Sequence, residues 1–283
     1  MDIGFSEEQE LLRDTARKFL DAACTTKFVR ERMATTEAVT PEFWSQLAWQ
    51  GWLGINFAED DGGSGLGLTD LVVLMEEMGR AVMPGPYLAT ALLGGAAIRE
   101  AGSSAQRQEH LPRIAAGELR ATLAATEPNA RWDASGITMN AQPMRGGFSL
   151  FGSKLFVPDA HLADIIVVAA RTRDGSTMED GVSLFLAPKE AAGLAITLLP
   201  TIDETRKLCE VRLDNVALPA SALLGHRHAG WAPLSRVVAR ATVALCAEMC
   251  GSAQQVLEMT VAYAVNPSSS GGIYWTQMFG TPP

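Results

Sequence analysis

Three short stretches of this chain carry residue types that could hold a flat ligand. Residues 123–128 close a predicted strand, and such an edge offers backbone N–H and C=O groups plus the Thr126 hydroxyl to a planar molecule. Residues 152–160 place Phe156 in a predicted turn, where an aromatic ring either stacks on a ligand or fills a core. Residues 215–225 read as a strand that ends at a helical segment. Each stretch alone has an ordinary structural explanation, so only their combination points to a site.

Other kinds of chemistry find little support in the sequence. It lacks G-x-S-x-G, a P-loop, H-E-x-x-H and a G-x-G-x-x-G between strand and helix. Residues 60–65 superficially resemble a calcium loop, but they lack its D-x-D-x-D-G alternation and closing glutamate, so we expect no metal site. The four cysteines form no C-x-x-C pair. Cys246 and Cys250 lie four residues apart on a predicted helix, and we expect both to be small buried residues.

The composition favours a packed protein with an acidic surface. Of 283 residues, 47% are hydrophobic and 19% charged, which is enough apolar material for a core. The net charge of −9 disfavours nucleic acid and anionic membranes as partners. The first ten residues are acidic and polar rather than a signal peptide, and no apolar run approaches the roughly 20 residues that span a bilayer. With so few cysteines, we expect a cytoplasmic location.

The elements that must position the three stretches begin with a helical segment, residues 1–117. Ser6 opens a capping box with the form S-x-x-Q, and Thr40 precedes a proline at the first helical position. Thr69 is expected to cap the next helix. Small residues at 89–101 predict a continuous helix, and another is expected over residues 105–116.

A β-rich segment, residues 118–225, follows the helical one. Short apolar runs separated by Gly, Pro, Asp and Asn predict strands that form a small antiparallel sandwich or barrel. These runs are residues 119–126, 148–151, 165–170, 182–187, 195–199 and 208–213.

Residues 226–264 return to helix. The predicted helix 233–264 is apolar almost all round, which is typical of a helix inside a bundle or a subunit interface. We expect it to be the first long helix of an incomplete C-terminal four-helix bundle. Residues 265–283 lack periodicity and are rich in Ser, Gly and Pro, so we expect a divergent, disordered tail.

In this order and with this spacing, the stretches resemble the acyl-CoA dehydrogenase family over residues 1 to about 264. The resemblance includes F-x-x-E-Q-x-x-L-R-D, A-E-x-x-G-G-x-G-L, M-E-E-M-G-R-A, T-E-P, G-x-K-x-F-V, A-D-x-x-V-V-A-A-R (residues 163–171), D-N-V-x-L-P and L-L-G. It implies an α+β fold with a helical N-terminal domain, a central β-domain and a C-terminal helical bundle. Residues 86–90, 131–133, 169–172 and 244–248 look closest to the small subunit of heteromeric, pimeloyl-CoA dehydrogenase-type members.

The resemblance implies an FAD-dependent desaturation of an acyl-CoA thioester between Cα and Cβ. A carboxylate base removes the α-proton while the flavin takes the β-hydride. The flavin-facing positions implied by the family are Leu123, Ala125, Thr126, Phe156, Val157 and Pro158. Relatives usually carry Thr or Ser at the last of these positions; Pro158 has neither a hydroxyl nor an N–H, so one flavin contact is lost.

The chain departs from the family pattern in two further places. Arg131, Trp132 and Asp133 replace a G-S-D triplet that lies near the cofactor phosphates and the CoA. Arg131 either replaces the lost donors with charge or is an ordinary surface arginine. Residues 265–268 replace an R-x-x-F-G segment, and the later helices with the glutamate base are missing, so no catalytic residue can be assigned. A shifted reading frame, a fragment or a natural truncation would each explain this ending.

Two functions remain open at this stage. The first is a small, FAD-associated and incomplete subunit of an acyl-CoA dehydrogenase. It would act in a homo- or hetero-oligomer with another such subunit, with electron-transfer flavoprotein as acceptor. The second is a non-catalytic structural partner of a complete large subunit. The retained Thr126 and Phe156 favour the first function, and the missing base favours the second.

Overall fold

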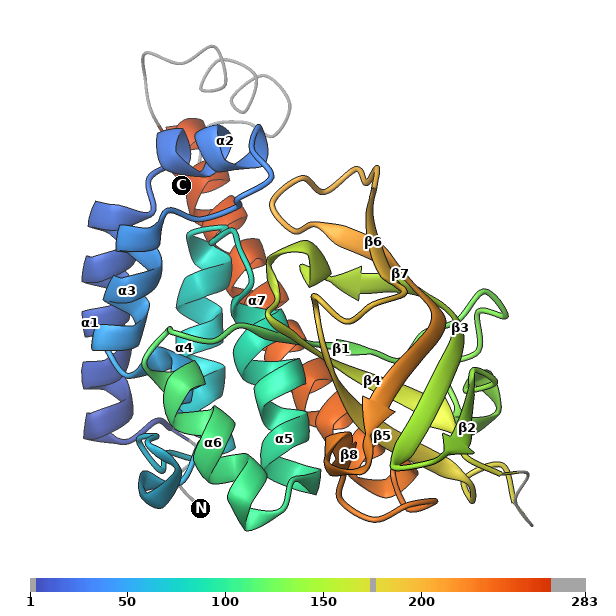
Figure 1. Cartoon of the computed structure of the whole chain (residues 1–283). Coiled ribbons are helices and arrows are strands. Elements are labelled where there is room, and N and C mark those ends of the chain that lie inside the picture. Colours follow the sequence, from blue (N-terminus) through green and yellow to red (C-terminus); the bar gives the residue numbers. More distant parts are fainter. Residues whose placement is uncertain (1–3, 174–176, 266–283) are drawn as a thin grey trace.

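The computed structural model of the chain describes residues 4–173 and 177–265. Helices precede and follow a β-sheet, so the order of elements agrees with the expected α+β fold (Figure 1). The α-helices are α1 Glu7–Ala23, α2 Thr26–Met33, α3 Pro41–Trp49, α4 Leu68–Arg80, α5 Ala96–Ala101, α6 Ser104–Ala115 and α7 Trp231–Val265. The expected disordered tail lies outside the described residues, apart from Val265, which ends α7.

Helix starts follow the local capping chemistry. Ser6 makes both hydrogen bonds of its capping box, and the Thr40 hydroxyl accepts the N–H of the third residue after it, so both predictions are confirmed. The prediction for Thr69 is wrong, because α4 begins at Leu68 and Thr69 lies inside the first turn. Gly67 precedes the helix, and its N–H donates to the Asp70 carboxylate at 2.8 Å.

The segment before α5 is a wider helix than predicted. Leu88–Gly95 forms a π-helix that continues directly into α5, where the sequence predicts one regular helix. Gly94 faces the first strand so closely that a Cβ there would lie 2.6 Å from Ala121. The absence of a side chain therefore lets this helix lie directly against the sheet.

The sheet is mixed rather than purely antiparallel. Its strands are β1 Ala121–Ala124, β2 Asn140–Met144, β3 Gly147–Pro158, β4 Ile165–Arg171, β5 Val182–Pro188, β6 Leu194–Leu199, β7 Leu208–Pro219 and β8 Leu223–Leu224. The strand order is β6-β7-β3-β2-β4-β5-β8, and β1 pairs with β4 in parallel. The expected antiparallel arrangement holds elsewhere except for one parallel β2–β4 pair. The chain leaves β1, forms the β2–β3 hairpin and returns beside β1, which makes that pair parallel.

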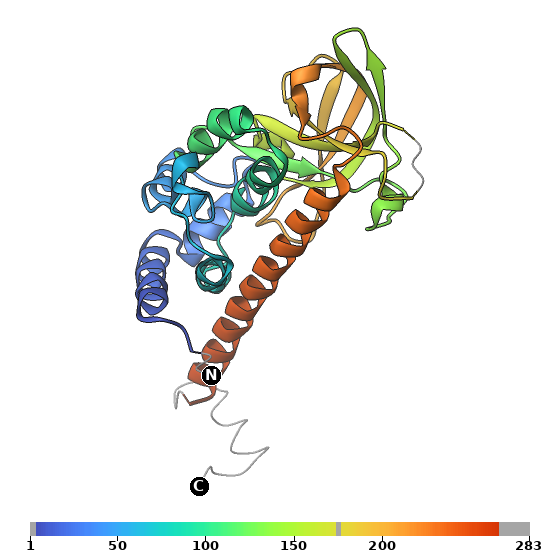
Figure 2. The same cartoon turned by 90° about the horizontal axis from the view of Figure 1, so that it is seen from below.

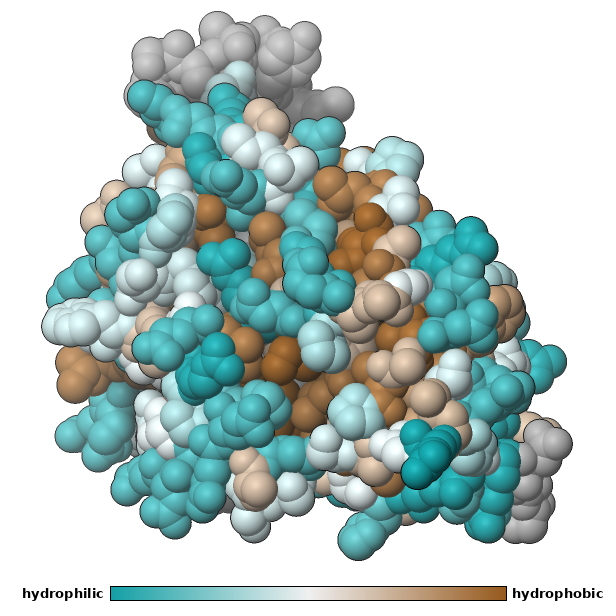
Figure 3. All heavy atoms as spheres, in the orientation of Figure 1, coloured by the Kyte–Doolittle hydropathy of each residue, from teal (hydrophilic) through white to brown (hydrophobic). Residues whose placement is uncertain are grey.

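The alternation of side chains along β4 joins the two halves of the molecule. Ile166 and Val168 point into a core between the strands, whereas Val167 and Ala169 belong to a core shared with the helices. On the face shown in Figure 3, apolar side chains gather along the seam between helices and sheet. The sheet is thus fixed to the helices by continuous apolar packing.

Helix α7 extends from the sheet along the helical part of the molecule (Figure 2). It crosses α4 closely, because a Cβ at Gly79 would collide with the Glu248 carbonyl and one at Gly251 with that of Glu76. No helix within residues 4–173 and 177–265 is long and apolar enough to cross a membrane.

The opposite face of α7 lies in the open. The prediction of burial for Cys246 and Cys250 is wrong, since both are exposed on the side away from α4. Their neighbour Ala247 points inward and is buried. Several other large apolar residues of α7 are exposed: Val238, Val243, Met249, Val256, Leu257, Met259 and Val261. Some apolar residues of α7 therefore pack against the rest of the fold, and others face solvent.

Candidate functional site

A bulge in β3 sets the direction of the Phe156 side chain. Lys154 pairs with Val211, and Val157 pairs with Cys209. Between these two pairs β3 contains one residue more than β7, which defines a β-bulge. Phe156 takes up the extra residue with a φ of 54°, in the left-handed region that bulky residues rarely adopt. Its side chain is 52% exposed, whereas Val157 is 1% exposed. The bulge turns the phenyl ring out of the sheet and returns Val157 to the core.

A cavity of about 390 Å³ collects most of the residues that the sequence indicates. It lies between the ends of β1 and β3 and the first half of α7. Among its lining residues are five of the six expected flavin-facing positions: Leu123, Ala125, Thr126, Phe156 and Pro158. Thr126 and Phe156 thus share one wall although they are 30 positions apart. Val157 does not line this wall, because the bulge turns it into the core between the strands.

The loop after β1 supplies the polar part of the same cavity. Arg131, Trp132 and Asp133 all line it, and the indole is 80% exposed. Arg131 donates to the Ser135 hydroxyl at 3.0 Å, and Asp133 accepts the Ser135 N–H at 2.9 Å. Hydrogen bonds from Ser135 lower the pKa of Asp133. The site therefore has a fixed cation and an ionised, hydrogen-bonded carboxylate beside an apolar wall.

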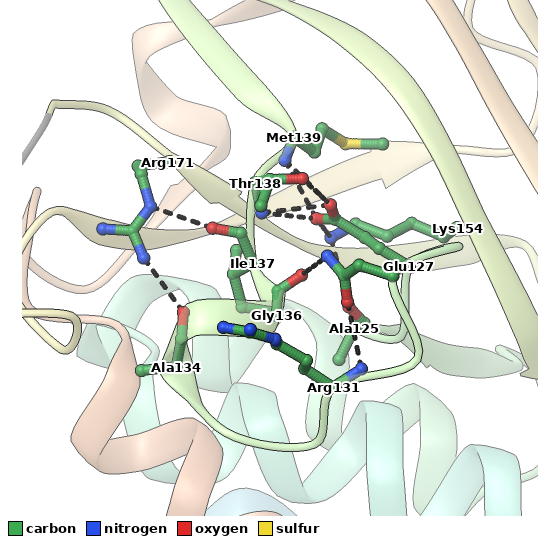
Figure 4. Close-up of polar contacts among 11 residues, drawn as sticks. Ala125, Glu127, Arg131, Ala134, Gly136, Ile137, Thr138, Met139, Lys154 and Arg171 are labelled. Carbon is green, nitrogen blue, oxygen red and sulfur yellow. Dashed lines mark hydrogen bonds and ion pairs between the residues drawn. The ribbon is translucent and has the colours of Figure 1, made fainter.

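Beneath the cavity wall, Glu127 and Lys154 form a buried ion pair with 2.6 Å between Oε1 and Nζ (Figure 4). Lys154 is 0% exposed and also donates to the Ala125 carbonyl at 3.2 Å. The Glu127 carboxylate accepts the backbone N–H groups of Thr138 and Met139.

The protonation of this pair follows from burial and charge. Burial alone would raise the pKa of Glu127, but the charge of Lys154 and hydrogen bonds from Lys154, Thr138 and Met139 lower it overall. Burial lowers the pKa of Lys154 to about 8, against the opposing effect of Glu127. At neutral pH the pair is therefore ionised.

Arg171 holds the loop from the other side. Its guanidinium donates to the Ile137 carbonyl at 2.8 Å and to the Ala134 carbonyl at 2.9 Å (Figure 4). Glu127, Lys154 and Arg171 lie in stretches that carry the family resemblance, but the motifs alone assign them no positioning role. A signal was present, since each is a single charged residue beside or within an otherwise apolar strand, where burial requires a partner.

A second cavity, of about 500 Å³, lies between α6 and the strands β5 and β8. Gln106 spans its edge and donates to the carbonyls of Ser221 and Leu223. None of the expected flavin-facing residues lines it. Among the described residues, no group of three or more His, Cys, Asp or Glu could hold a metal ion. The first cavity is therefore the candidate site.

Comparison with known proteins identifies the relatives of this chain. The sequence profile of the acyl-CoA dehydrogenase N-terminal domain matches residues 6–118, and that of the middle domain matches residues 122–216. Mitochondrial isovaleryl-CoA dehydrogenase of Pongo abelii is 30% identical over 267 residues, which are 92% of this chain and 63% of that protein.

Two solved structures show the same fold. The FAD complex of PigA has a TM-score of 0.87 at 25% identity, over 98% of this chain and 74% of that chain. The ChsE4–ChsE5 complex from Mycobacterium tuberculosis has a TM-score of 0.84 at 23% identity, over 98% and 72%, a likeness of fold alone.

The chain belongs to the acyl-CoA dehydrogenase family, whose members bind FAD. It spans less than two-thirds of the length of the curated relatives that it matches.

Proposed function

We propose that the cavity binds the flavin ring of FAD and that the chain acts as a small-subunit-like part of a cytoplasmic acyl-CoA dehydrogenase. The reaction would be the desaturation of an acyl-CoA thioester between Cα and Cβ. One observation carries this proposal: Phe156 and Thr126 meet in one cavity with the apolar residues Leu123 and Ala125. Its volume falls within the range of roughly 300–1,000 Å³ that small-molecule sites occupy.

The residues present fit a flat, partly polar ring. Phe156 offers an exposed aromatic face for stacking, and Thr126 brings a hydroxyl to the same wall. Pro158 lines the wall without an N–H or hydroxyl, so the ring would make fewer polar contacts there. Arg131 is placed to bind an anionic group at the cavity margin. When bound, FAD would supply the hydride acceptor.

Proton removal needs a carboxylate from elsewhere. Among the described residues that line the cavity, Asp133 is the one carboxylate, and hydrogen bonds from Ser135 lower its pKa, which makes it a weak base. Glu127 is held in its ion pair beneath the wall and does not line the cavity. We assign the base to a carboxylate outside the described residues. A second acyl-CoA dehydrogenase subunit in a homo- or hetero-oligomer is its proposed source.

Flavin binding and turnover test this function separately. The purified chain is titrated with FAD, and bound flavin is followed by absorbance and fluorescence. It is then mixed with acyl-CoAs of several chain lengths and an artificial acceptor dye, with and without a complete acyl-CoA dehydrogenase subunit. We expect FAD binding by the chain and dye reduction only with the partner. Absence of FAD binding in both mixtures would refute the proposal. Electron-transfer flavoprotein is the proposed natural acceptor and can replace the dye.

A structural partner without catalysis is the second candidate, and the exposed apolar face of α7 favours it. A large apolar patch on a protein surface usually marks a partner site. In that case the chain would bind a complete subunit and raise its stability without adding flavin. The ratio of FAD to the complex separates the two candidates. An FAD content equal to that of the large subunit alone indicates the structural role.

A further inference from the structure

The candidate cavity depends on two segments that are far apart in the sequence. Thr126 lies at the end of β1, and Phe156 lies in the β3 bulge. A flat ring bound against a wall built from both segments requires them to keep a fixed relative position, because displacement by about 1 Å can cost as much as 10²-fold in function. Some contact must therefore set the spacing of the two segments.

We propose that Glu127 and Lys154 are positioning residues that hold the Thr126 segment against the Phe156 bulge and thereby shape the cavity for a flat flavin ring. This inference rests on the proposed flavin binding and deepens it. Glu127 directly follows Thr126, and Lys154 precedes Phe156 by two residues. The ion pair thus joins the two wall segments next to the residues that face the cavity.

Two hydrogen bonds complete the same connection. The Leu155 N–H donates to the Thr126 carbonyl at 2.9 Å, and Lys154 Nζ donates to the Ala125 carbonyl at 3.2 Å. Together with the ion pair, they link three consecutive residues of one segment to two of the other. An opening of the pair would therefore shift the backbone of the wall rather than one side chain alone.

The carboxylate of Glu127 also reaches the third wall segment. It accepts the N–H groups of Thr138 and Met139, which follow the loop that carries Arg131 (Figure 4). The opposite side of this loop is held by Arg171. One buried carboxylate thus connects the segments that contribute Thr126, Phe156 and the polar margin.

The energetics favour positioning over plain stabilisation. Removing two charges from water costs several kcal/mol per ion, so apolar residues of similar size often stabilise a fold equally well. The left-handed backbone of Phe156 is also strained, and such strain persists only where the surroundings fix it. The buried Glu127–Lys154 pair lies next to the strained Phe156, where it can hold the backbone of the cavity wall in a fixed position.

The test uses the full chain and four variants: Lys154→Met, Glu127→Gln, the double variant, and Glu77→Gln as a matched control. Glu77 is also a buried carboxylate, but its partner Arg17 joins α1 to α4. FAD affinity is measured by flavin fluorescence, and Tm is measured without FAD. We expect both single variants in the pair to raise the Kd for FAD by about tenfold or more. Glu77→Gln should change the Kd by less than about twofold, because it lies in another part of the fold.

The double variant distinguishes positioning from general stability. It leaves no charge unpaired, so we expect most of the lost Tm to return while the Kd stays high. If the Kd recovers together with Tm, or if the Kd follows Tm in all four variants, the pair only supports the fold and the inference is wrong.

Hydrogen exchange without FAD decides the inference even if the proposed function fails. In Lys154→Met, we expect faster exchange in residues 123–128 and 152–158, including the Leu155 amide that bonds Thr126. The β6–β7 hairpin should be unchanged. Wild-type chain that binds no FAD, together with this local change, would refute only the proposed function. A uniform change over the sheet would overturn the positioning role.

Discussion

Two buried carboxylates hold distant segments together in different surroundings. Glu77 on α4 is 3% exposed and binds Arg17 with two hydrogen bonds of 2.7 and 2.9 Å, but the Arg17 side chain is 42% exposed. Glu127 is similarly buried, and its partner Lys154 has no exposed surface. The helical pair keeps its cation hydrated, whereas the pair below the cavity gives up hydration on both sides. Full dehydration is a poor route to stability, so its location beside a cavity suggests a functional reason.

The largest expected effect comes from removing the cation of the dehydrated pair. Lys154→Met leaves the Glu127 carboxylate buried without a compensating cation, and we expect a loss of about 3–5 kcal/mol in the free energy of unfolding. Without the cation, burial would raise the pKa of Glu127 above its unfolded value. The loss should therefore be smallest below the ordinary glutamate pKa of about 4.3 and grow as pH rises. Urea unfolding at several pH values measures this, and a pH-independent loss would contradict it.

A smaller effect is expected at the hydrated pair. Glu77→Gln leaves Arg17 in contact with water, so we expect a loss of about 1–2 kcal/mol in the free energy of unfolding. The same urea titration compares it directly with Lys154→Met. Equal losses of unfolding free energy in Glu77→Gln and Lys154→Met would show that the hydrated and the dehydrated pair do not differ in energetic cost.

Local sequence was sufficient where structure depends on neighbours along the chain. Capping at Ser6 and Thr40 and the length of α7 could be predicted because caps and helical periodicity are short-range. Strand β2 was missed because its pattern is polar and mostly exposed, and the parallel β1–β4 pair depends on a long return of the chain. The exposure of Cys246 depends on which side of α7 meets α4, and periodicity does not reveal this for a helix that is apolar all round.

In the candidate site, too, some features could be predicted from the sequence and others depend on the folded sheet. Thr126 and Phe156 could be placed together from family motifs, since the motifs keep their order and spacing. Val157 lies in the core because a one-residue bulge reverses the alternation of side chains, and the local sequence does not indicate the bulge. The pairing of Glu127 with Lys154 joins residues 27 positions apart, so only the folded sheet reveals it.

Strain at Phe156 gives a prediction with effects of opposite sign. The left-handed backbone of Phe156 costs about 1–3 kcal/mol, and Phe156→Gly removes this strain. Glycine also raises the entropy of the unfolded chain, which offsets part of the gain. We expect a net gain of up to about 1 kcal/mol in stability. FAD affinity should fall by about tenfold through lost stacking.

Phe151→Gly is the matched control, because Phe151 is also an exposed aromatic residue of β3 but its φ is not positive. This variant should lose stability and keep its FAD affinity. Thermal unfolding and flavin titration check both variants. A loss of stability in Phe156→Gly would show that its backbone stores no strain.

The smallest expected effect is a change of FAD affinity with pH that the stability of the fold does not follow. Lys154 has a pKa of about 8, lowered by burial, so it loses its proton in the folded chain as pH rises through that value. The ion pair with Glu127 then becomes a hydrogen bond from a neutral amine to the carboxylate, which is weaker, and FAD affinity should fall by about three- to fivefold between pH 7 and 9. The stability of the fold should not fall with it. Between pH 8 and the unfolded lysine value of about 10.4, the unfolded chain binds more protons at this residue, so the Lys154 contribution to stability rises with pH.

Flavin titrations and urea unfolding over the same pH series measure both quantities. Lys154→Met should show a flat FAD affinity in this range, and a parallel decline in the variant would assign the pH dependence to another group.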